Sequence, residues 1–389
     1  MQAKRQVRKG TVKLGSLIAP FEEAINKREE RLARHAEKQR IIGWFCTYTP
    51  IEMIHAAGFL PVRIRGGETS IERTNDLVPS FICPYMRASL ERGLRGEYRY
   101  LSGIVQGYSC DVTCGVVDIW KENIGNGLYH TIPLPYNNNP GARKYFRESL
   151  NELSGKLTGI GGKFSQTILA KSLNLYGDIR ATLIKLHELR LEGRLPFSAR
   201  QFYTVAEAGF SLPPVDYLAH LSILLAELPN VTEDGAEESS LRGNGVQVLV
   251  SGSLIENMNI YDLLEEAGLH IIADDLCSGY RFCDPVDGEG ADRLERLIDR
   301  YMNRFPCPSR SYFQDRVPRL IQRVKDSGAR GIILILQKFC TPHLADYPAL
   351  TVELKNAGIP SLLVELEESG GAPGQLKTRF EAFREMIHG

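Results

Sequence analysis

The sequence has no long apolar run and no excess of either charge. None of its apolar stretches approaches the roughly 18 residues that a transmembrane helix needs, so we expect no membrane span. Lysine plus arginine and aspartate plus glutamate number 47 each, which gives no reason to expect nucleic acid or an acidic membrane surface as a partner. The basic start, MQAKRQVRKG, is not followed by an apolar segment and does not resemble a signal peptide. We expect a soluble cytoplasmic protein.

Nucleotide-binding motifs are also missing. A phosphate-binding loop needs a glycine five residues before the glycine of its Gly-Lys pair, and in GKLTGIGGKFS Leu157 stands at that position. No G-x-G-x-x-G follows a predicted strand, so nicotinamide and flavin cofactors have no expected binding loop. If the activity of this protein needs ATP, we expect a separate protein to hydrolyse it.

From about Ile41 onward, short apolar strands alternate with helices, a pattern typical of parallel βαβ units. Residues 1–40 predict a charged N-terminal helix, residues 41–150 a first α/β domain and residues 241–389 a second one. Residues 151–240 are helical in period and lead into a polar, Gly-rich linker, VTEDGAEESSLRGNG. The prediction is an α/β protein with two Rossmann-like parallel-sheet domains, an N-terminal helix and an intervening helical segment.

The eight cysteines require an explanation, because disulfides are not expected in a large cytoplasmic protein. Four of them follow predicted strands: Cys46 after IIGWF, Cys110 after LSGIVQG, Cys277 after LHIIADD and Cys340 after GIILILQ. Cysteines used only for packing would favour strand middles and helix faces. The carboxyl ends of parallel strands are instead where α/β sheets bind ligands. We therefore interpret these four cysteines as candidate metal ligands.

Two further cysteines, Cys83 and Cys307, are each followed by proline, which keeps the cysteine extended, as a ligand at a loop corner often is. A loop cysteine without a role explains each of them equally well. We interpret Cys114 and Cys283 as packing residues. Zinc sites favour local C-x₂₋₄-C pairs, and only Cys110 with Cys114 forms one. Single ligands scattered over two domains favour an iron–sulfur cluster, either one cubane with surplus cysteines or two cubanes that share an atom.

Five motifs, taken in order, resemble the D-component family of 2-hydroxyacyl-CoA dehydratases, which is related to benzoyl-CoA reductase subunits. They are FCTYTPIEMIHAAGFLPVRI, CPYMRASLERGL, SCDVTCG, DDLCSG and QKFCTPH. The resemblance covers most of the chain from about residue 41, and it implies a single [4Fe–4S] cubane held by Cys83, Cys110 and Cys340. The six-cysteine pattern is similar to a branch of that family, the double-cubane cluster proteins. That branch implies two cubanes bridged by a sulfide, the second one held by the additional cysteines Cys46, Cys277 and Cys307.

The resemblance implies a homodimeric iron–sulfur reductase of small, hard-to-reduce molecules, supplied with low-potential electrons by a separate ATP-dependent iron–sulfur reductase. Two alternatives stay open: a single-cubane subunit of a 2-hydroxyacyl-CoA dehydratase or aryl-CoA reductase, and a non-catalytic cluster carrier or binding protein. Reduction consumes protons, and Glu52 and His343 are candidate proton donors because each lies close in sequence to a predicted ligand. A carboxylate at a helix start and a solvated histidine explain the two residues as well.

Overall fold

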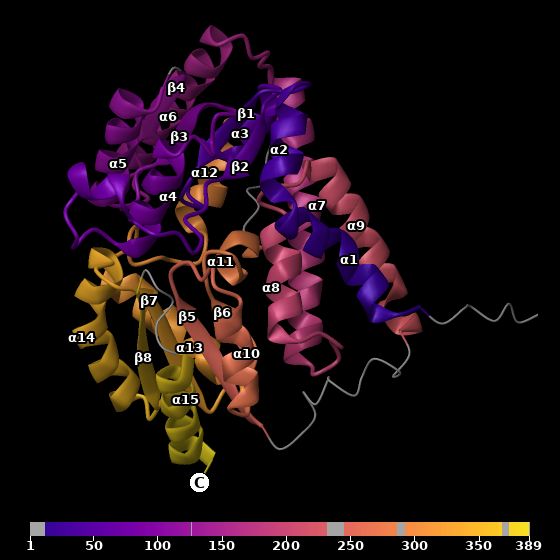
Figure 1. Cartoon of the computed structure of the whole chain (residues 1–389), viewed down its shortest axis with the longest axis vertical. Helices are drawn as coiled ribbons and strands as arrows, with labels where there is room; N and C mark the ends of the chain where they lie inside the picture. The colour runs from indigo at the N-terminus through magenta and orange to yellow at the C-terminus, as the bar shows by residue number, and fades with distance from the viewer. Residues whose placement is uncertain (1–11, 126, 232–244, 286–291, 368–372, 389) are drawn as a thin grey trace, which may run out of the picture.

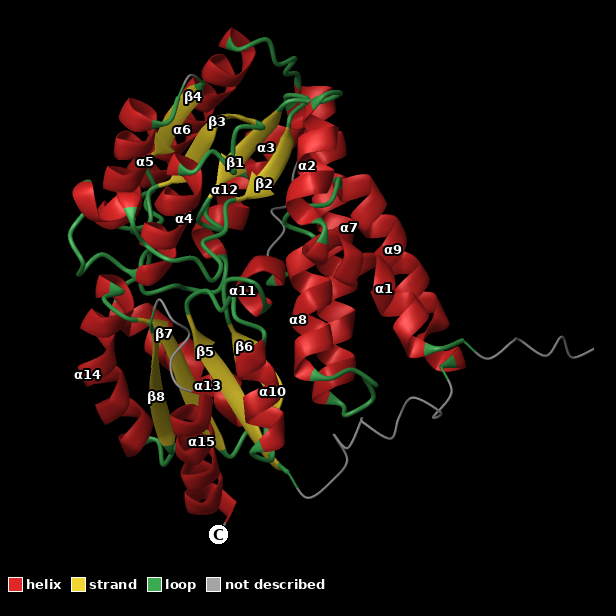
Figure 2. Ribbon diagram, in the orientation of Figure 1, coloured by secondary structure: helices red, strands yellow, loops and turns green. Residues whose placement is uncertain are grey.

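The computed structural model describes residues 12–125, 127–231, 245–285, 292–367 and 373–388. In this part of the chain two parallel four-stranded sheets lie one above the other, with helices packed around them (Figure 1, Figure 2). The predicted fold class, α/β with two Rossmann-like sheets, is confirmed. The predicted linker VTEDGAEESSLRGNG falls almost entirely outside the described residues. The limits of the predicted domains stay a prediction.

The first sheet has the spatial order β2-β1-β3-β4, and all its strands pair in parallel. Its strands are β1 (Ile41–Trp44), β2 (Leu60–Arg63), β3 (Leu101–Gly107) and β4 (Leu128–Ile132). The helices that connect them are α3 (Ile51–Ala56), α4 (Pro84–Leu94) and α5 (Asp111–Asn123). Every residue of β1 and β2 is buried, as expected for a parallel sheet whose two faces are both covered.

The second sheet repeats this order as β6-β5-β7-β8. Its strands are β5 (Val246–Gly252), β6 (Leu269–Asp275), β7 (Gly331–Gln337) and β8 (Ser361–Leu366). Its helices are α10 (Asn259–Glu266), α11 (Tyr280–Cys283), α13 (Phe313–Ser327), α14 (Thr341–Asn356) and α15 (Pro373–His388). In both sheets the first strand pairs with the second on one side and the third on the other. This reversal is the switch point beside which open α/β sheets bind ligands.

A layer of helices flanks the sheets on the right of Figure 1. The remaining helices before β5 are α1 (Leu14–Asn26), α2 (Arg28–Ala36), α6 (Pro140–Gly159), α7 (Gln166–Leu191), α8 (Ala199–Ala208), α9 (Pro214–Glu227) and the short 3₁₀ turns η1 (Arg73–Asp76) and η2 (Leu228–Asn230). The single N-terminal helix predicted from the sequence is therefore wrong in detail, because Lys27 leaves helical geometry and separates α1 from α2. None of the described helices is long and apolar enough to cross a membrane.

Helix α12 (Arg293–Asn303) joins the core of the first sheet, although its sequence belongs to the second half of the chain. Its apolar side, with Leu297 and Ile298, packs with Ile42 of β1 and Val105 of β3. An amphipathic helix can bury its apolar side against any matching surface, so the sequence alone does not say which sheet it covers. As a result, the chain crosses between the two sheets near residue 304.

A buried ion pair joins the first sheet to the helical layer. Arg63, the last residue of β2, places Nη2 2.6 and 2.7 Å from the two carboxylate oxygens of Glu207 on α8. The side chains are 1% and 2% exposed, and the Arg63 guanidinium lies over the ring of Phe210, 4.3 Å from its centroid. Removing one partner from such a pair leaves the other charge buried without compensation.

We expect Arg63→Met to destabilise the folded protein by about 3–5 kcal/mol, because the Glu207 carboxylate then stays buried and unpaired. Thermal and urea unfolding would measure the loss. The matched control is Lys27→Met, which removes an exposed pair with Glu23 on α1 and should leave the unfolding midpoint unchanged. Equal midpoints for the two variants would contradict the assigned role of the buried pair.

Candidate metal centre

The predicted placement of four cysteines at strand ends is confirmed. Cys46 follows β1, Cys110 follows β3, Cys277 follows β6 and Cys340 follows β7, each by two or three residues. The loops after these strands gather in the region between the two sheets (Figure 2). The carboxyl ends of both sheets therefore supply side chains to one junction.

Three cysteines form a first thiol group, and each of them is the residue immediately before a helix. They are Cys83 before α4, Cys110 before α5 and Cys340 before α14. Burial raises the pKa of Cys83 to about 12, and the neighbouring Cys110 thiol adds to this. Burial also raises the pKa of Cys340, with further contributions from Cys83 and Cys110. The three thiols are thus close enough to act on one another, and each lies at the positive end of a helix dipole.

The other three candidate cysteines form a second thiol group around Arg281. Burial raises the pKa of Cys46 to about 12, with the thiols of Cys277 and Cys307 adding to the effect. Arg281 is 1% exposed, and its Nη1 lies 3.6 Å from both Cys277 Sγ and Cys307 Sγ. Burial raises the pKa of Cys277, while the adjacent Arg281 charge opposes the shift. A guanidinium between two sulfur atoms would stabilise negative charge placed on them by a bound metal.

The two thiol groups are neighbours, because the Cys307 thiol is among the charges that raise the pKa of Cys340. Of the two remaining cysteines, Cys114 interacts with the thiol of Cys110, four residues earlier in the chain. Cys283 directs Sγ to the carbonyl oxygen of Gly279, 3.5 Å away in the turn before α11. Cys114 lies within α5, and burial raises its pKa to about 11. The contact of Cys283 is compatible with a packing residue, and the interpretation of Cys114 stays a prediction.

Two consecutive aspartates at the end of β6 hold the second thiol group in place, and the sequence pattern did not single them out. Asp275 accepts a hydrogen bond from Arg281 Nε and another, 2.9 Å long, from the hydroxyl of Ser251. Asp274 Oδ1 accepts hydrogen bonds from the backbone N–H groups of Leu276 and Tyr280, on either side of Cys277. The sequence feature that could have identified them is the Asp-Asp pair directly before Leu276 and Cys277.

The donor set suits an iron–sulfur cluster better than a single ion. No three His, Cys, Asp or Glu side chains of the described residues converge on a point that one metal ion could occupy. A cubane is larger than an ion, so its ligands stand further apart. It is also anionic when held by thiolates. Burial raises the pKa of Cys46 and of Cys277, and the Arg304 charge opposes this shift in both. The thiol donors and the surrounding positive charge are therefore compatible with such a cluster.

The raised pKa values also argue against a nucleophilic cysteine. A catalytic thiolate requires a lowered pKa, whereas the thiols of Cys46 and Cys83 have pKa values of about 12 because they are buried. Such thiols keep their protons at neutral pH until a bound metal displaces them. This behaviour is compatible with metal binding.

Glu52 lies in a buried ion pair. Its Oε1 accepts a 2.7 Å hydrogen bond from Arg180 Nη1, and its Oε2 accepts one of 2.8 Å from the hydroxyl of Tyr301. Burial would raise the pKa of Glu52, but Arg180 and Tyr301 hold it below the ordinary 4.5. These are the contacts of an ionised carboxylate that joins α3, α7 and α12. The predicted role of proton donor gains no support from them.

His343 lies beside the first thiol group, with Nδ1 3.3 Å from Cys340 Sγ. The side chain is only 5% exposed, so the alternative interpretation as a solvated histidine is wrong. Burial and the charges of Arg281 and Arg316 hold the pKa of His343 well below its ordinary value, so the imidazole is neutral. Its position next to a predicted ligand is as expected, and its role as a proton donor stays a prediction.

We expect Gly279→Ala to disrupt the loop that carries Cys277. A Cβ atom at position 279 would lie 2.0 Å from Asp274 Oδ1, so the aspartate has to move and release the loop. Metal content after anaerobic purification and the thermal midpoint should both fall. The control Gly155→Ala places its Cβ in open space on α6 and should not reduce either quantity. An unchanged metal content in Gly279→Ala would contradict this role of the loop.

We expect Glu52→Gln to lower stability by on the order of 3 kcal/mol at neutral pH, because the charge opposite Arg180 is lost. The lowered pKa means that the carboxylate stabilises the fold fully above pH 4.5 and loses this effect as the pH falls through its folded-state pKa. The stability gap to the wild type should therefore close in acid. The control Glu152→Gln, in an exposed pair, should show no gap at any pH. A loss of activity with unchanged stability would instead identify Glu52 as a catalytic group.

A family model and several known proteins match this chain over most of its length. A family model described as 2-hydroxyglutaryl-CoA dehydratase, D-component, matches residues 46–387. The chain is 25% identical to the (R)-phenyllactyl-CoA dehydratase beta subunit of Clostridium sporogenes, over 94% of this chain and 97% of that protein. It is 27% identical to lactoyl-CoA dehydratase subunit beta of Anaerotignum propionicum, over 89% and 91% of the two chains. A benzoyl-CoA reductase subunit of Thauera aromatica is 25% identical, over 90% and 91%.

The matched span begins at Cys46 and includes both sheets' carboxyl ends and all six candidate cysteines. The relatives are matched over nearly their full lengths, so the similarity concerns the whole architecture and not one motif. The chain belongs to the 2-hydroxyglutaryl-CoA dehydratase D-component family.

Proposed function

We propose that this protein is an iron–sulfur reductase of small, hard-to-reduce molecules, with two [4Fe–4S] cubanes bridged by a sulfide. The observation that carries the proposal is that six cysteines from both sheets meet at one junction, three of them directly before a helix and two of them 3.6 Å from Arg281 Nη1. The first thiol group would hold one cubane and consists of Cys83, Cys110 and Cys340. The second would hold the other and consists of Cys46, Cys277 and Cys307. Three thiolates and a shared sulfide supply one ligand to every iron atom of each cubane.

When bound, the cluster would supply electrons at low potential. The residues of this chain stabilise negative charge at the junction in two ways. The amino termini of α4, α5 and α14 direct their positive ends at the first thiol group. Arg281, oriented by Asp275, places a cation between two thiols of the second group. Cys307 is only 5% exposed, so water has little access to the second thiol group from the side of this residue.

The proposal includes a separate electron donor, because the sequence has no loop that would bind ATP. That donor would be an ATP-dependent iron–sulfur reductase, and this chain would act on its small-molecule substrate as a homodimer. The eight cysteines are all free in the structure, which is compatible with a reducing cytoplasm as the site of action.

A second candidate function is that of a single-cubane subunit of a 2-hydroxyacyl-CoA dehydratase or aryl-CoA reductase. The names of the similar proteins favour it, since they are dehydratase beta subunits and a benzoyl-CoA reductase subunit. The first thiol group would suffice for one cubane. The arrangement of Cys277, Cys307 and Arg281 then has no evident use, which is why we rank this function second.

A non-catalytic cluster carrier is a third candidate. Transfer of a cluster to an acceptor requires exposed ligands. Here the thiols lie in the junction between two sheets, and Arg304 donates hydrogen bonds to the carbonyl oxygens of Thr47, after β1, and of Arg281, after β6. Release would require these contacts to break, so the geometry favours a resident cluster.

We expect Cys277→Ser and Cys307→Ser each to lose about half of the bound iron and acid-labile sulfide while keeping the fold. The low-potential signal in electron paramagnetic resonance and substrate reduction should disappear. The control is Cys283→Ser, which changes a buried cysteine outside both thiol groups and should keep its iron. Full iron content and activity in both variants would refute the double-cubane proposal.

The wild-type protein, purified without oxygen, should contain two cubanes' worth of iron per chain. One cubane's worth would favour the dehydratase or aryl-CoA reductase assignment and call for a screen of CoA esters. Protein that is purified without iron and stays folded, with a thermal midpoint that added iron and sulfide do not change, would show that the cysteines serve packing alone.

A further inference from the structure

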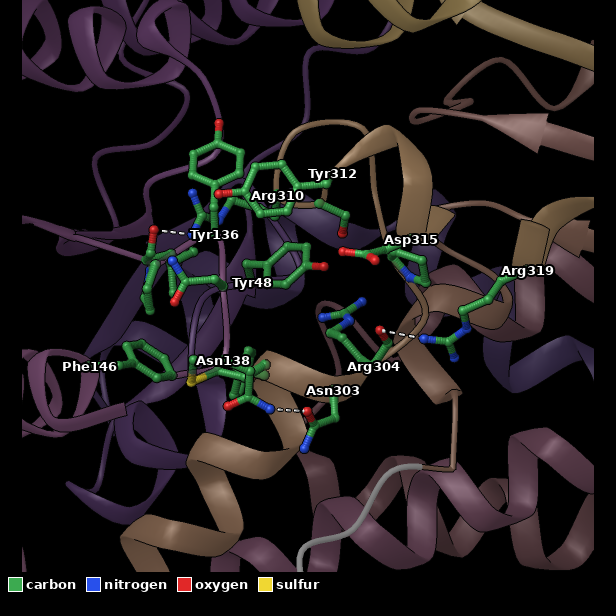
Figure 3. Close-up of a pocket in the computed structure, with 17 residues that line it drawn as sticks. Tyr48, Tyr136, Asn138, Phe146, Asn303, Arg304, Arg310, Tyr312, Asp315 and Arg319 are labelled. Carbon is green, nitrogen blue, oxygen red and sulfur yellow. Dashed lines mark hydrogen bonds between the residues drawn. The ribbon is translucent and has the colours of Figure 1, made fainter. Parts of the chain in front are cut away.

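A cavity of about 320 Å³ lies beside the second thiol group, between the loop that follows β4 and the segment from α12 to the start of α13. Tyr48 and Arg304 line its inner part, and Figure 3 shows Tyr48 lying between Arg304 and Arg310. Tyr136 and Tyr312, which are 50% and 51% exposed, line its mouth. The cavity therefore runs from the surface toward the metal centre.

The charge of this cavity favours an anion. Three arginines and one aspartate line it: Arg304, Arg310, Arg319 and Asp315. Arg310 is only 5% exposed; its Nη2 donates to the carbonyl oxygen of Leu134, and its Nη1 has no hydrogen-bond partner among the described residues. Arg304 donates to the carbonyl oxygens of Thr47 and Arg281 and contributes its charge from the cavity wall. A buried guanidinium with a donor to spare is a site for a carboxylate.

The shape and lining favour a flat organic group next to that anion. The rings of Tyr136 and Tyr312 lie side by side with their centroids 6.2 Å apart, and the Arg310 guanidinium lies 4.3 Å from the Tyr136 centroid. Exposed aromatic rings of this kind offer a face on which a planar group can stack. Together, the rings and the guanidinium match a molecule that is flat at one end and negatively charged at the other.

The inner end of the cavity lies next to Cys307 in the chain, because Pro306 and Arg310 line it and the Arg310 N–H donates a 2.9 Å hydrogen bond to the carbonyl oxygen of Cys307. The thiol of Cys46 also interacts with the charge of Arg310. The hydroxyl of Tyr48, whose ring lies under Arg304 at 4.6 Å, interacts with the thiols of Cys307 and Cys46. A molecule bound against Arg310 would thus lie beside the sulfur atoms that we assign to one of the cubanes.

We propose that this cavity binds a small planar organic anion, with its carboxylate held by Arg310 in the field of Arg304 and its flat part against Tyr136 and Tyr312. This proposal rests on the proposed function. It adds to that function the class of substrate that reaches the cluster. Binding itself depends only on the residues of the cavity, so the two proposals can fail independently.

The test is calorimetric titration of the anaerobically purified protein with benzoate, and with benzamide and cyclohexanecarboxylate as probes of charge and planarity. Benzoate should bind saturably, benzamide at least about tenfold more weakly and cyclohexanecarboxylate about threefold to tenfold more weakly. Arg310→Gln should weaken benzoate binding by about tenfold or more. Tyr312→Ala should weaken it about threefold and leaves the contacts of Arg310 in place. Tyr145→Ala, an equally exposed tyrosine on α6 outside the cavity, should bind as the wild type does.

Iron and sulfide are measured on the same preparations. Benzoate binding that is absent, or unchanged in both Arg310→Gln and Tyr312→Ala, overturns the cavity proposal whatever the iron content. Equal affinity for benzoate and inorganic phosphate overturns the assignment of a planar ligand. Binding with the expected order in protein that contains a single cubane supports the cavity and refutes only the double-cubane proposal.

Discussion

The structure depends on one constraint, which is that two parallel sheets direct the carboxyl ends of their strands at the same junction. Helices begin there with unsatisfied N–H groups, so the junction is positive before any side chain is counted. Arg281, Arg304 and Arg316 add buried cations. Asp275 pairs with two of these cations, Arg281 and Arg316. Six thiols from both sheets also lie in this region.

The contacts across the junction are polar and specific. Arg304, at the end of α12, donates to the carbonyl oxygen of Thr47 in the loop after β1 and to that of Arg281 in α11. Asp275 orients Arg281 and lies within 3.5 Å of Arg316 Nη2. Because each of these groups is buried, a shift of one sheet against the other would leave several of them unsatisfied. The same network therefore fixes the sheets and the relative positions of the thiols.

The placement of the candidate ligands could be predicted because it depends on local pattern. Cys46, Cys110, Cys277 and Cys340 follow apolar strands directly, and the position of a residue after a strand is fixed by the chain itself. The contacts around the candidate ligands could not be predicted in this way. Glu52 is separated from its partner Tyr301 by 249 positions, so its environment as an ion-paired carboxylate was not visible in the sequence.

The two parallel sheets and the candidate ligands follow from the sequence alone, because side-chain periodicity and strand-end position are properties of short segments. Two features required the three-dimensional arrangement: α12 packs on the first sheet, and Arg281 lies between Cys277 and Cys307. These features depend on how the sheets face each other. That arrangement results from packing and charge compensation summed over distant residues, which no local pattern records.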